Sequence, residues 1–397
     1  MDVTVVLEGR FSQTPDGGVW TNSVFSNRFW DRYLEVFENV HVVARVQQVA
    51  SPPLGFKRSD GDRVSFVPIP YYVGPLQYLS KRVEVIRATR RASRNSDALV
   101  LRVGSQLAAI YLSQVSRERP FGLEVVGDPF DTFSPAASRH PLRRFFRRKF
   151  TEDLRNQCKR AAAVAYVTEG ALQSRYPPSK GAFSTSYSSI DLAESDFREK
   201  TDFSDSYRLI SVGTLEELYK GIDVLLDAVA VCHARKLPLT LEIVGDGRYR
   251  PVLERKARNL GIDRFVTFAG HVTPGDGVRT RLDLAGLFVL ASRQEGLPRS
   301  LIEAMARGLP CIATQVGGIP ELLDHSDLVP PNDVNALATA IFEAVKSEER
   351  RRAMSSRNFL SAKRYLSGSL RIRRVSFYER LRDQTANWRR SIGDVDR

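Results

Sequence analysis

The chain has 397 residues, of which 42% are apolar and 26% are charged. Two ordinary globular domains fit this length, and the composition excludes a disordered chain. The formal net charge of +13 favours an anionic partner such as nucleic acid, an anionic membrane or a phosphorylated ligand. Because no nucleic-acid-binding motif accompanies the charge, we expect no nucleic-acid partner.

Short apolar runs alternate with helical stretches along the whole chain. In the first half we predict strands at 3–6, 40–43, 64–67, 98–101, 123–126 and 163–167, with helices at 24–37 and 76–94. In the second half we predict strands at 209–212, 239–244, 265–268, 287–290 and 310–313, with helices at 221–235, 249–260, 299–307, 319–323 and 335–347. This alternation predicts α/β architecture with two doubly wound, Rossmann-like domains whose ligands lie at the carboxyl ends of the strands.

The segment 177–205 is rich in Ser, Pro, Gly and Asp and has little periodicity. We therefore expect an N-terminal domain over 1–190, a second domain over 205–365 and a helical tail over 366–397.

Targeting and redox features are few. The first seven residues lack a basic region and a cleavage site, and no window reaches the roughly 18 apolar residues of a membrane span. Cys158, Cys232 and Cys311 have no metal-ligand spacing, which favours a reducing compartment without disulfides. We expect a cytoplasmic protein without a bound metal or cofactor.

The stretch 139–150 interleaves arginines with Leu142, Phe145, Phe146 and Phe150, which recur at roughly helical spacing. Two interpretations remain open. One is an interfacial helix on anionic lipid, which would place the protein peripherally on the inner face of the cytoplasmic membrane. The other is a core-packed helix with a basic outer face.

The most specific motif is Glu295-Gly296-Leu297-Pro298, followed by Glu303 eight residues after the first glutamate. It follows a predicted strand and opens a predicted helix. The N–H groups at a helix start form a ready anion site, so a pyrophosphate fits there. Glu303 lies inside the helix, where it can accept hydrogen bonds from a ribose, and Glu295 stands at the mouth, where it can bind a sugar hydroxyl.

Three weaker motifs follow other strands of the second half. Lys220 follows Gly213 and Thr214 at a strand-to-helix junction, where it can offer a positive charge to phosphate. Gly245 allows close backbone approach, and the backbone of Gly270 and His271 could contact a base. A further glycine turn runs from Gly317 to Glu321.

In their order and spacing, these motifs resemble glycosyltransferase family 4, whose members are retaining enzymes of the GT-B fold with two Rossmann-like domains facing a central cleft. The resemblance covers about residues 209–344, and the N-terminal half is similar only in plan. It implies that Lys220 and the backbone at Gly296 and Leu297 hold the donor diphosphate, while the Gly17-Gly18 loop faces the donor from the other domain. The predicted donor site comprises Gly17, Gly18, Gly213, Thr214, Lys220, Gly245, Gly270, His271, Glu295, Gly296, Leu297, Pro298 and Glu303.

Two positions depart from the family pattern. Thr214 stands where the family has an arginine, and Arg248, Arg293 or Arg299 are candidates to compensate. Asp128 stands where many members have a histidine, so it is a candidate catalytic residue beside Glu295 and Lys220. Its alternative is a turn aspartate before a proline.

The resemblance implies a retaining, metal-independent transfer of a hexose-type sugar from a nucleotide-diphosphate sugar, with UDP as the expected nucleotide. A carbohydrate or lipid-linked acceptor, in surface-polysaccharide or glycoconjugate assembly, is the expected context. Asp60-Gly61-Asp62 lies in a polar loop and is interpreted as a turn rather than a metal site. The alternative from another class is a non-catalytic protein that binds nucleotide sugars or lipid phosphates. A GT-B epimerase or phosphorylase is a weaker enzyme alternative. A nicotinamide dehydrogenase is disfavoured, because this chain lacks the glycine motif that such enzymes have after the first strand.

Overall fold

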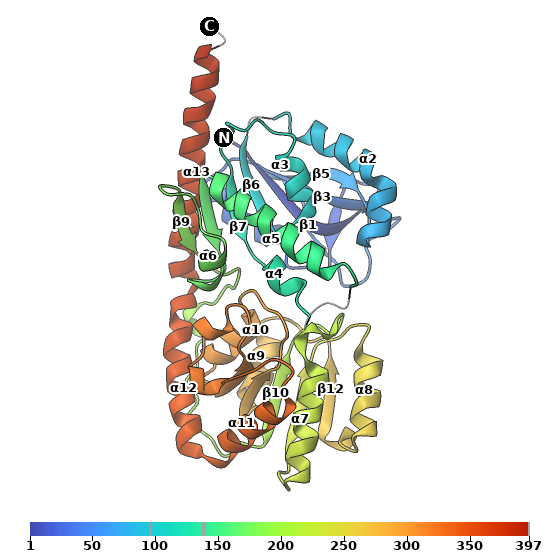
Figure 1. Cartoon of the computed structure of the whole chain (residues 1–397), viewed down its shortest axis with the longest axis vertical. Coiled ribbons are helices and arrows are strands. Elements are labelled where there is room, and N and C mark those ends of the chain that lie inside the picture. Colours follow the sequence, from blue (N-terminus) through green and yellow to red (C-terminus); the bar gives the residue numbers. More distant parts are fainter. Residues whose placement is uncertain (96, 136–139, 396–397) are drawn as a thin grey trace.

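The computed structural model describes residues 1–95, 97–135 and 140–395. Figure 1 shows two α/β domains stacked along the long axis, with the last helix running beside both. Among the described residues, no helix combines the length and apolarity needed to cross a bilayer.

The N-terminal domain is built on a nine-stranded sheet. Seven parallel strands have the order β5-β3-β1-β6-β7-β8-β9, and β2 and β4 are attached in antiparallel pairing. The strands are β1 (Val3–Gln13), β2 (Val19–Thr21), β3 (Val40–Gln48), β4 (Lys57–Arg58), β5 (Val64–Pro70), β6 (Ala98–Val103), β7 (Gly122–Val125), β8 (Ala163–Tyr166) and β9 (Phe183–Ser186). The helices are α1 (Asn27–Leu34), α2 (Gly74–Ala92), α3 (Gln106–Leu112), α4 (Pro129–Thr132), α5 (Arg143–Arg160) and α6 (Ala171–Arg175).

The second sheet has six parallel strands in the order β12-β11-β10-β13-β14-β15. They are β10 (Arg208–Val212), β11 (Thr240–Val244), β12 (Val266–Gly270), β13 (Leu287–Leu290), β14 (Cys311–Thr314) and β15 (Leu328–Val329). The helices are α7 (Ile222–Ala234), α8 (Arg250–Asn259), α9 (Asp276–Asp283), α10 (Arg299–Ala306), α11 (Val334–Lys346), α12 (Glu348–Ala362) and α13 (Ser367–Val395). Short 3-10 helices are η1 (Glu194–Asp196), η2 (Leu218–Lys220), η3 (Asp263–Phe265), η4 (Ile319–Glu321), η5 (His325–Asp327) and η6 (Lys363–Tyr365).

Both sheets reverse their strand order once, and these points decide where ligands can bind. The reversal lies between β1 and β6 in the first sheet and between β10 and β13 in the second. Crossover connections leave a crevice there, at the carboxyl ends of the strands. The predicted class of two doubly wound α/β domains is confirmed.

Several predicted elements differ in detail. The helix expected at 24–37 is only Asn27–Leu34, and the helix expected at 319–323 is the 3-10 turn η4. Strand β9 lies inside the segment 177–205, for which no element was predicted. Its residues are only partly buried, as expected of an edge strand, so it lacks the apolar run that marks the inner strands.

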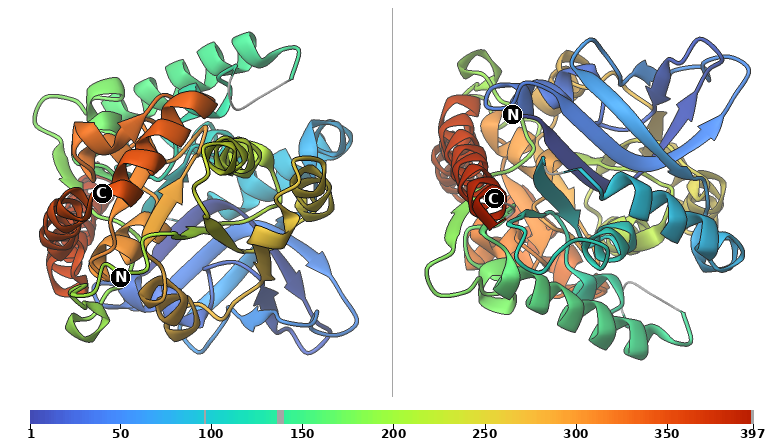
Figure 2. Two further views of the ribbon diagram at one scale, coloured as in Figure 1. Left: turned by 90° about the horizontal axis from the view of Figure 1, so that it is seen from below. Right: turned by 90° about the horizontal axis from the view of Figure 1, so that it is seen from above.

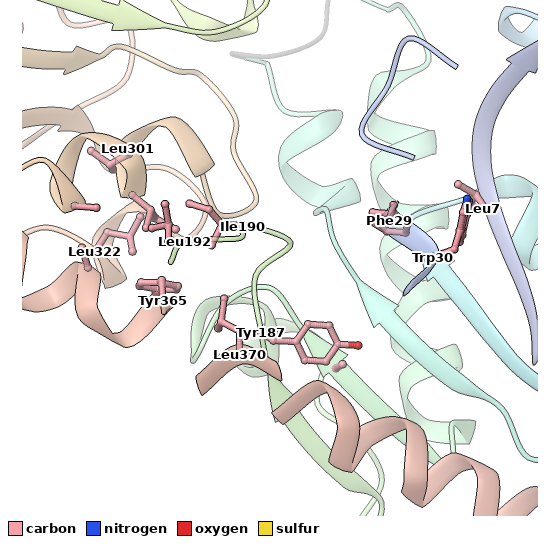
Figure 3. Close-up of a cluster of buried hydrophobic side chains, with 14 of the residues drawn as sticks. Leu7, Phe29, Trp30, Tyr187, Ile190, Leu192, Leu301, Leu322, Tyr365 and Leu370 are labelled. Atoms are coloured by element: carbon pink, nitrogen blue, oxygen red, sulfur yellow. The ribbon is translucent and has the colours of Figure 1, made fainter. Parts of the chain in front are cut away.

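The two domains share one continuous hydrophobic cluster. Figure 3 shows Leu7 and Trp30 of the first domain at one end and Leu301 and Leu322 of the second at the other, with Ile190 of the connecting segment between them. This arrangement makes the connecting segment part of the core.

Helix α13 returns to the N-terminal domain and packs on β8 and β9. Its Tyr378 hydroxyl donates to Glu124 Oε1 at 2.8 Å, and Tyr33 and Tyr187 donate to the same carboxylate at 2.9 and 2.8 Å. Arg102 forms an ion pair with it. Burial alone would raise the pKa of Glu124, but the Arg102 charge and the three hydroxyl donors outweigh it and lower that pKa.

Each of the two interpretations of the stretch 139–150 fits part of its apolar residues. Phe146 and Phe150 of α5 pack against Phe133, with ring centroids 5.7 and 5.6 Å from it. Leu142 and Phe145 remain 57% and 60% exposed. The expected apolar face is therefore half covered, and Arg139 lies outside the described residues.

Candidate active site

The reversal point of the second sheet brings Lys220 and Glu295 together. Lys220 ends η2 after β10, and Glu295 follows β13, so neighbouring strands deliver both side chains. Lys220 Nζ lies 2.6 Å from Glu295 Oε1, and Ser292 Oγ donates to the same oxygen at 2.7 Å. Their side chains are only 12% and 8% exposed. An ion pair this sheltered holds both charges in a defined place.

Glycines let the surrounding turns touch one another. Gly221 has a φ of +66°, and a Cβ there would lie 1.9 Å from the carbonyl oxygen of Ala291. Gly317 has a φ of +55°, and a Cβ there would lie 2.0 Å from the carbonyl oxygen of Glu295. Only glycine accommodates both conditions, so these positions keep Lys220 and Glu295 in place.

Helix α10 starts directly beside this ion pair, after Gly296, Leu297 and Pro298. Among the described residues, no side chain caps its start, so its first N–H groups are open to an anion. A Cβ on Gly296 would lie 2.8 Å from the carbonyl oxygen of Val126, which follows β7. The carboxyl edges of the two sheets therefore meet at this turn.

Glu303 is largely buried near Arg299 and Arg279. Burial raises the pKa of this carboxyl, and the two arginines oppose that effect. Arg279 also pairs with Asp196 at 2.8 Å, in the segment that connects the domains.

The other predicted donor residues form two groups. Gly213 and Gly245 follow β10 and β11, and Gly270 is the last residue of β12. The N–H of Gly245 donates to Gly270 O at 2.9 Å. His271 is exposed next to them. The Gly17-Gly18 turn is closed by Thr14 and Asp16, and within the described chain no hydrogen bond or ion pair joins it to the second domain. The structure thus brings the first group to the sheet edge beside the site.

Two of the three arginines that could compensate for Thr214 are already paired with other residues. Arg293 is committed to Asp223 and Asn332, and its side chain is 14% exposed. Arg248 pairs with Glu217. Arg299, the first residue of α10, is exposed and forms no hydrogen bond or ion pair with a described side chain. Of the three candidates, only Arg299 is free to meet a phosphate.

The Asp128 carboxylate is held by structural partners in the lining of the pocket described below. Its side chain is 3% exposed and accepts hydrogen bonds from the Phe130 N–H at 2.8 Å and the Tyr176 hydroxyl at 2.5 Å. It also pairs with Arg175. The carboxylate caps α4 and closes a turn, which was the alternative in the sequence. Asp60 likewise has a turn role, because it accepts from the Val19 N–H at 2.8 Å and pairs with Arg58. No metal-ligand cluster occurs within 1–95, 97–135 or 140–395.

A pocket of about 300 Å³ lies at the reversal point of the first sheet, between β1, α3, α4 and α5. Its lining combines carboxylates, amides and aromatic rings and comprises Glu8, Gly104, Ser105, Gln106, Ala109, Gly127, Asp128, Pro129, Thr132, Phe133, Phe150, Asp153, Leu154 and Gln157. Glu8 is fixed by Tyr72 and Ser105, each 2.9 Å away. Of its lining residues the sequence singled out only Asp128 as a site candidate, although Gly104 and Ser105 also follow the carboxyl end of a strand, β6.

Glu321, at the end of η4 in the second domain, forms a contact with the first domain. Its carboxylate accepts hydrogen bonds from the N–H groups of Glu169, Gly170 and Ala171 at 2.6, 3.0 and 2.5 Å. These N–H groups open α6 in the first domain. Arg364, just before α13, donates to the Glu321 carbonyl at 3.0 Å. The glycine turn predicted from Gly317 to Glu321 therefore ends in an interdomain contact.

Comparisons with known proteins agree with this architecture. Residues 206–347 match the model of the family described as glycosyl transferases group 1. Protein CapJ of Staphylococcus aureus is 26% identical over 347 residues, which cover 87% of this chain and 86% of that protein. The amylovoran biosynthesis glycosyltransferase AmsK of Erwinia amylovora is 31% identical over 150 residues, about a third of either chain (36% of each).

Among solved structures, HepE of Anabaena in complex with UDP and glucose has a TM-score of 0.62 at 16% identity, covering 97% of this chain and 99% of that one. Fold and site thus define an enzyme of the glycosyltransferase class with the GT-B fold. Residues 206–347 are therefore a domain of the family described as glycosyl transferases group 1.

Proposed function

We propose that the protein transfers a hexose-type sugar from a nucleotide-diphosphate sugar to a hydroxyl acceptor, with retention of configuration and without a metal ion. The observation that supports this most directly is the contact between Lys220, Glu295 and Ser292 beside the uncapped start of α10. HepE, which has the same fold, binds UDP and glucose, and this motivates UDP as the nucleotide.

In this proposal the site stabilises the charge that develops on the leaving diphosphate. The Lys220 ammonium and the N–H groups of α10 supply positive potential where a divalent ion acts in other transferases. Arg299 supplies the second cation, because Thr214 offers none. Glu295 positions a donor-sugar hydroxyl, Glu303 accepts from the ribose, and the leaving phosphate takes the proton of the acceptor hydroxyl as that oxygen attacks the same face of the sugar.

We place the acceptor in the pocket of the first domain. Gln106 and Gln157 line it, and their side chains form no hydrogen bond with a described residue, so both amides can bind sugar hydroxyls. Phe133 and Phe150 stack on each other in its wall and offer an apolar surface to a pyranose ring. The carboxylates of Glu8 and Asp153 disfavour an anionic group at this place.

We further propose a cytoplasmic enzyme of polysaccharide or glycoconjugate assembly, in line with the name of AmsK, that attaches peripherally to anionic membrane through residues 140–150. Only Leu142 and Phe145 of this stretch are free to enter lipid. Flotation with anionic liposomes tests it: a variant with Arg143, Arg144, Arg147 and Arg148 changed to Glu should float less, and equal flotation would remove this stretch from the proposal.

The experiment for the main proposal is a thermal-shift panel of nucleotide sugars with and without EDTA. A ligand that binds only the folded protein raises Tm, so the donor should be distinguished from the rest of the panel. EDTA should leave that shift unchanged, and loss of the shift in EDTA would contradict metal independence.

The alternative of a non-catalytic binding protein is favoured by one feature, Thr214 in place of an arginine. Donor hydrolysis without acceptor separates the two functions. A transferase site releases some free sugar from the donor, whereas a binding protein gives a thermal shift and no hydrolysis.

A further inference from the structure

Helix α2 has an outer face that no other part of the described chain covers. Its inner face buries Val85 and Thr89 against the sheet. On the opposite side, Leu76, Leu79 and Val83 are 81%, 62% and 59% exposed. Their spacing of three and four residues places them on one stripe of the helix. Exposed leucines in series are unfavourable in water, so the stripe requires an explanation.

The second half of the same stripe is cationic. Arg87, Arg90 and Arg91 continue it toward the C-terminus, and each is exposed. Within the described residues, none of these three side chains forms a hydrogen bond or an ion pair. The helix has five basic residues and one acidic residue, Glu84. Apolar residues followed by unpaired cations on one stripe are typical of a helix that lies in the headgroup region of an anionic bilayer.

The start of α5 adds to the same side of the domain. Val85 of α2 and Leu154 of α5 belong to one buried cluster, so both helices cover the same face of the sheet. Crossover helices begin at the carboxyl edge of a parallel sheet, which places the exposed Leu76 and Phe145 near that edge. Figure 1 and Figure 2 show α2 and α5 in this layer. Residues of α3 and α5 line the pocket described above.

We propose that this face of the N-terminal domain, formed by the outer face of α2 and the start of α5, docks on an anionic lipid bilayer. An anionic bilayer fits this face better than a protein partner. The unpaired arginines are spread along the helix, and a lipid surface offers negative charge along its whole length. The consequence for the acceptor rests on the proposed transferase function: the pocket between α3 and α5 would receive a sugar attached to a membrane lipid.

The test is flotation of the full-length protein with vesicles of phosphatidylcholine, with or without phosphatidylglycerol. One variant changes Leu76, Leu79 and Val83 to Gln. The matched control changes three exposed apolar residues of the second domain, Val252, Leu284 and Leu360, to Gln. We expect the α2 variant to lose at least about tenfold in partitioning to anionic vesicles, because each side chain would leave the apolar layer. The control should float like the unaltered protein.

A third variant, with Arg87, Arg90 and Arg91 changed to Glu, should lose binding to anionic vesicles with little change on neutral ones. Equal flotation of the α2 variant, or no flotation of the unaltered protein, would overturn the proposal. Light scattering in solution adds a further outcome: an unaltered protein that dimerises and an α2 variant that does not would assign the face to a second copy. The thermal shift caused by a nucleotide sugar should be the same in these variants as in the unaltered protein. Thermal shifts therefore test the transferase proposal, and flotation tests the membrane proposal, independently of each other.

Discussion

The two faces of the domain junction differ in how they are built. On the donor side, Lys220, Glu295 and the start of α10 are held by backbone turns, and glycines at 221 and 317 allow the contact. On the proposed acceptor side, the pocket is formed by side chains from β1, α3, α4 and α5. A site made by backbone has short motifs at constant spacing, whereas a site made by scattered side chains has none. The donor side can therefore be recognised in a sequence, and the acceptor side is recognised only in the fold.

The largest effect that tests this contrast is expected on the donor side. Glu295→Ala should lower transfer by about 100-fold to 1000-fold, because one preorganised hydrogen-bonding group at the reacting sugar is lost. Nucleotide affinity, measured by thermal shift or calorimetry, should remain largely intact. Glu217→Ala, on the exposed loop before Lys220, is the matched control. Full transfer activity in Glu295→Ala would remove Glu295 from the site.

A smaller and selective effect is expected on the acceptor side. Gln157→Leu should raise the acceptor KM about 2-fold to 10-fold, because a neutral hydrogen bond to a bound hydroxyl contributes about 0.5–1.5 kcal/mol. Donor hydrolysis without acceptor should stay unchanged. A parallel fall in hydrolysis would show that the pocket belongs to the donor, and the contrast between the two faces would be lost.

The pH dependence of nucleotide binding gives a third test. Burial raises the pKa of Glu303, so its carboxylate is protonated at a higher pH than an ordinary glutamate. Protonation removes a charged acceptor for the ribose, and affinity should therefore weaken several-fold as pH falls through this raised pKa. Titration calorimetry across mildly acidic pH measures the change. Glu303→Gln should bind weakly at every pH and lose this acid dependence; a variant that retains it would exclude Glu303.

The smallest effect is expected at the contact that joins the two faces. Glu321→Gln should lower the free energy of unfolding by about 1–2 kcal/mol, because three N–H donors lose a charged acceptor. For a protein of two domains this corresponds to a few degrees in Tm, read by calorimetry. Glu118→Gln, an exposed change elsewhere in the first domain, should leave Tm alone. An unchanged Tm in both variants would show that the contact does not stabilise the junction.

The inner strands of both sheets can be predicted from the sequence, whereas the edge strand β9 cannot. Strands such as β1, β6 and β13 are buried on both faces, so their valines and leucines form continuous runs. Edge strand β9 lacks such a signal. The role of Asp128 cannot be decided from its local sequence either, because an aspartate before a proline can be a catalytic residue or a helix cap. Its partners Arg175 and Tyr176 are nearly 50 residues away, and only the fold reveals them.

The Glu124 cluster has a consequence for biosynthesis. Tyr378 lies 254 residues after the carboxylate that it contacts, and Phe377 and Leu381 fill the same core. At about 5–20 residues per second, roughly 13 to 50 seconds separate the emergence of these partners from the ribosome. During that interval the Glu124 carboxylate lacks one of its three hydroxyl donors, and the apolar residues that α13 covers lack that helix. The first domain to be synthesised is thus completed by the last helix of the chain.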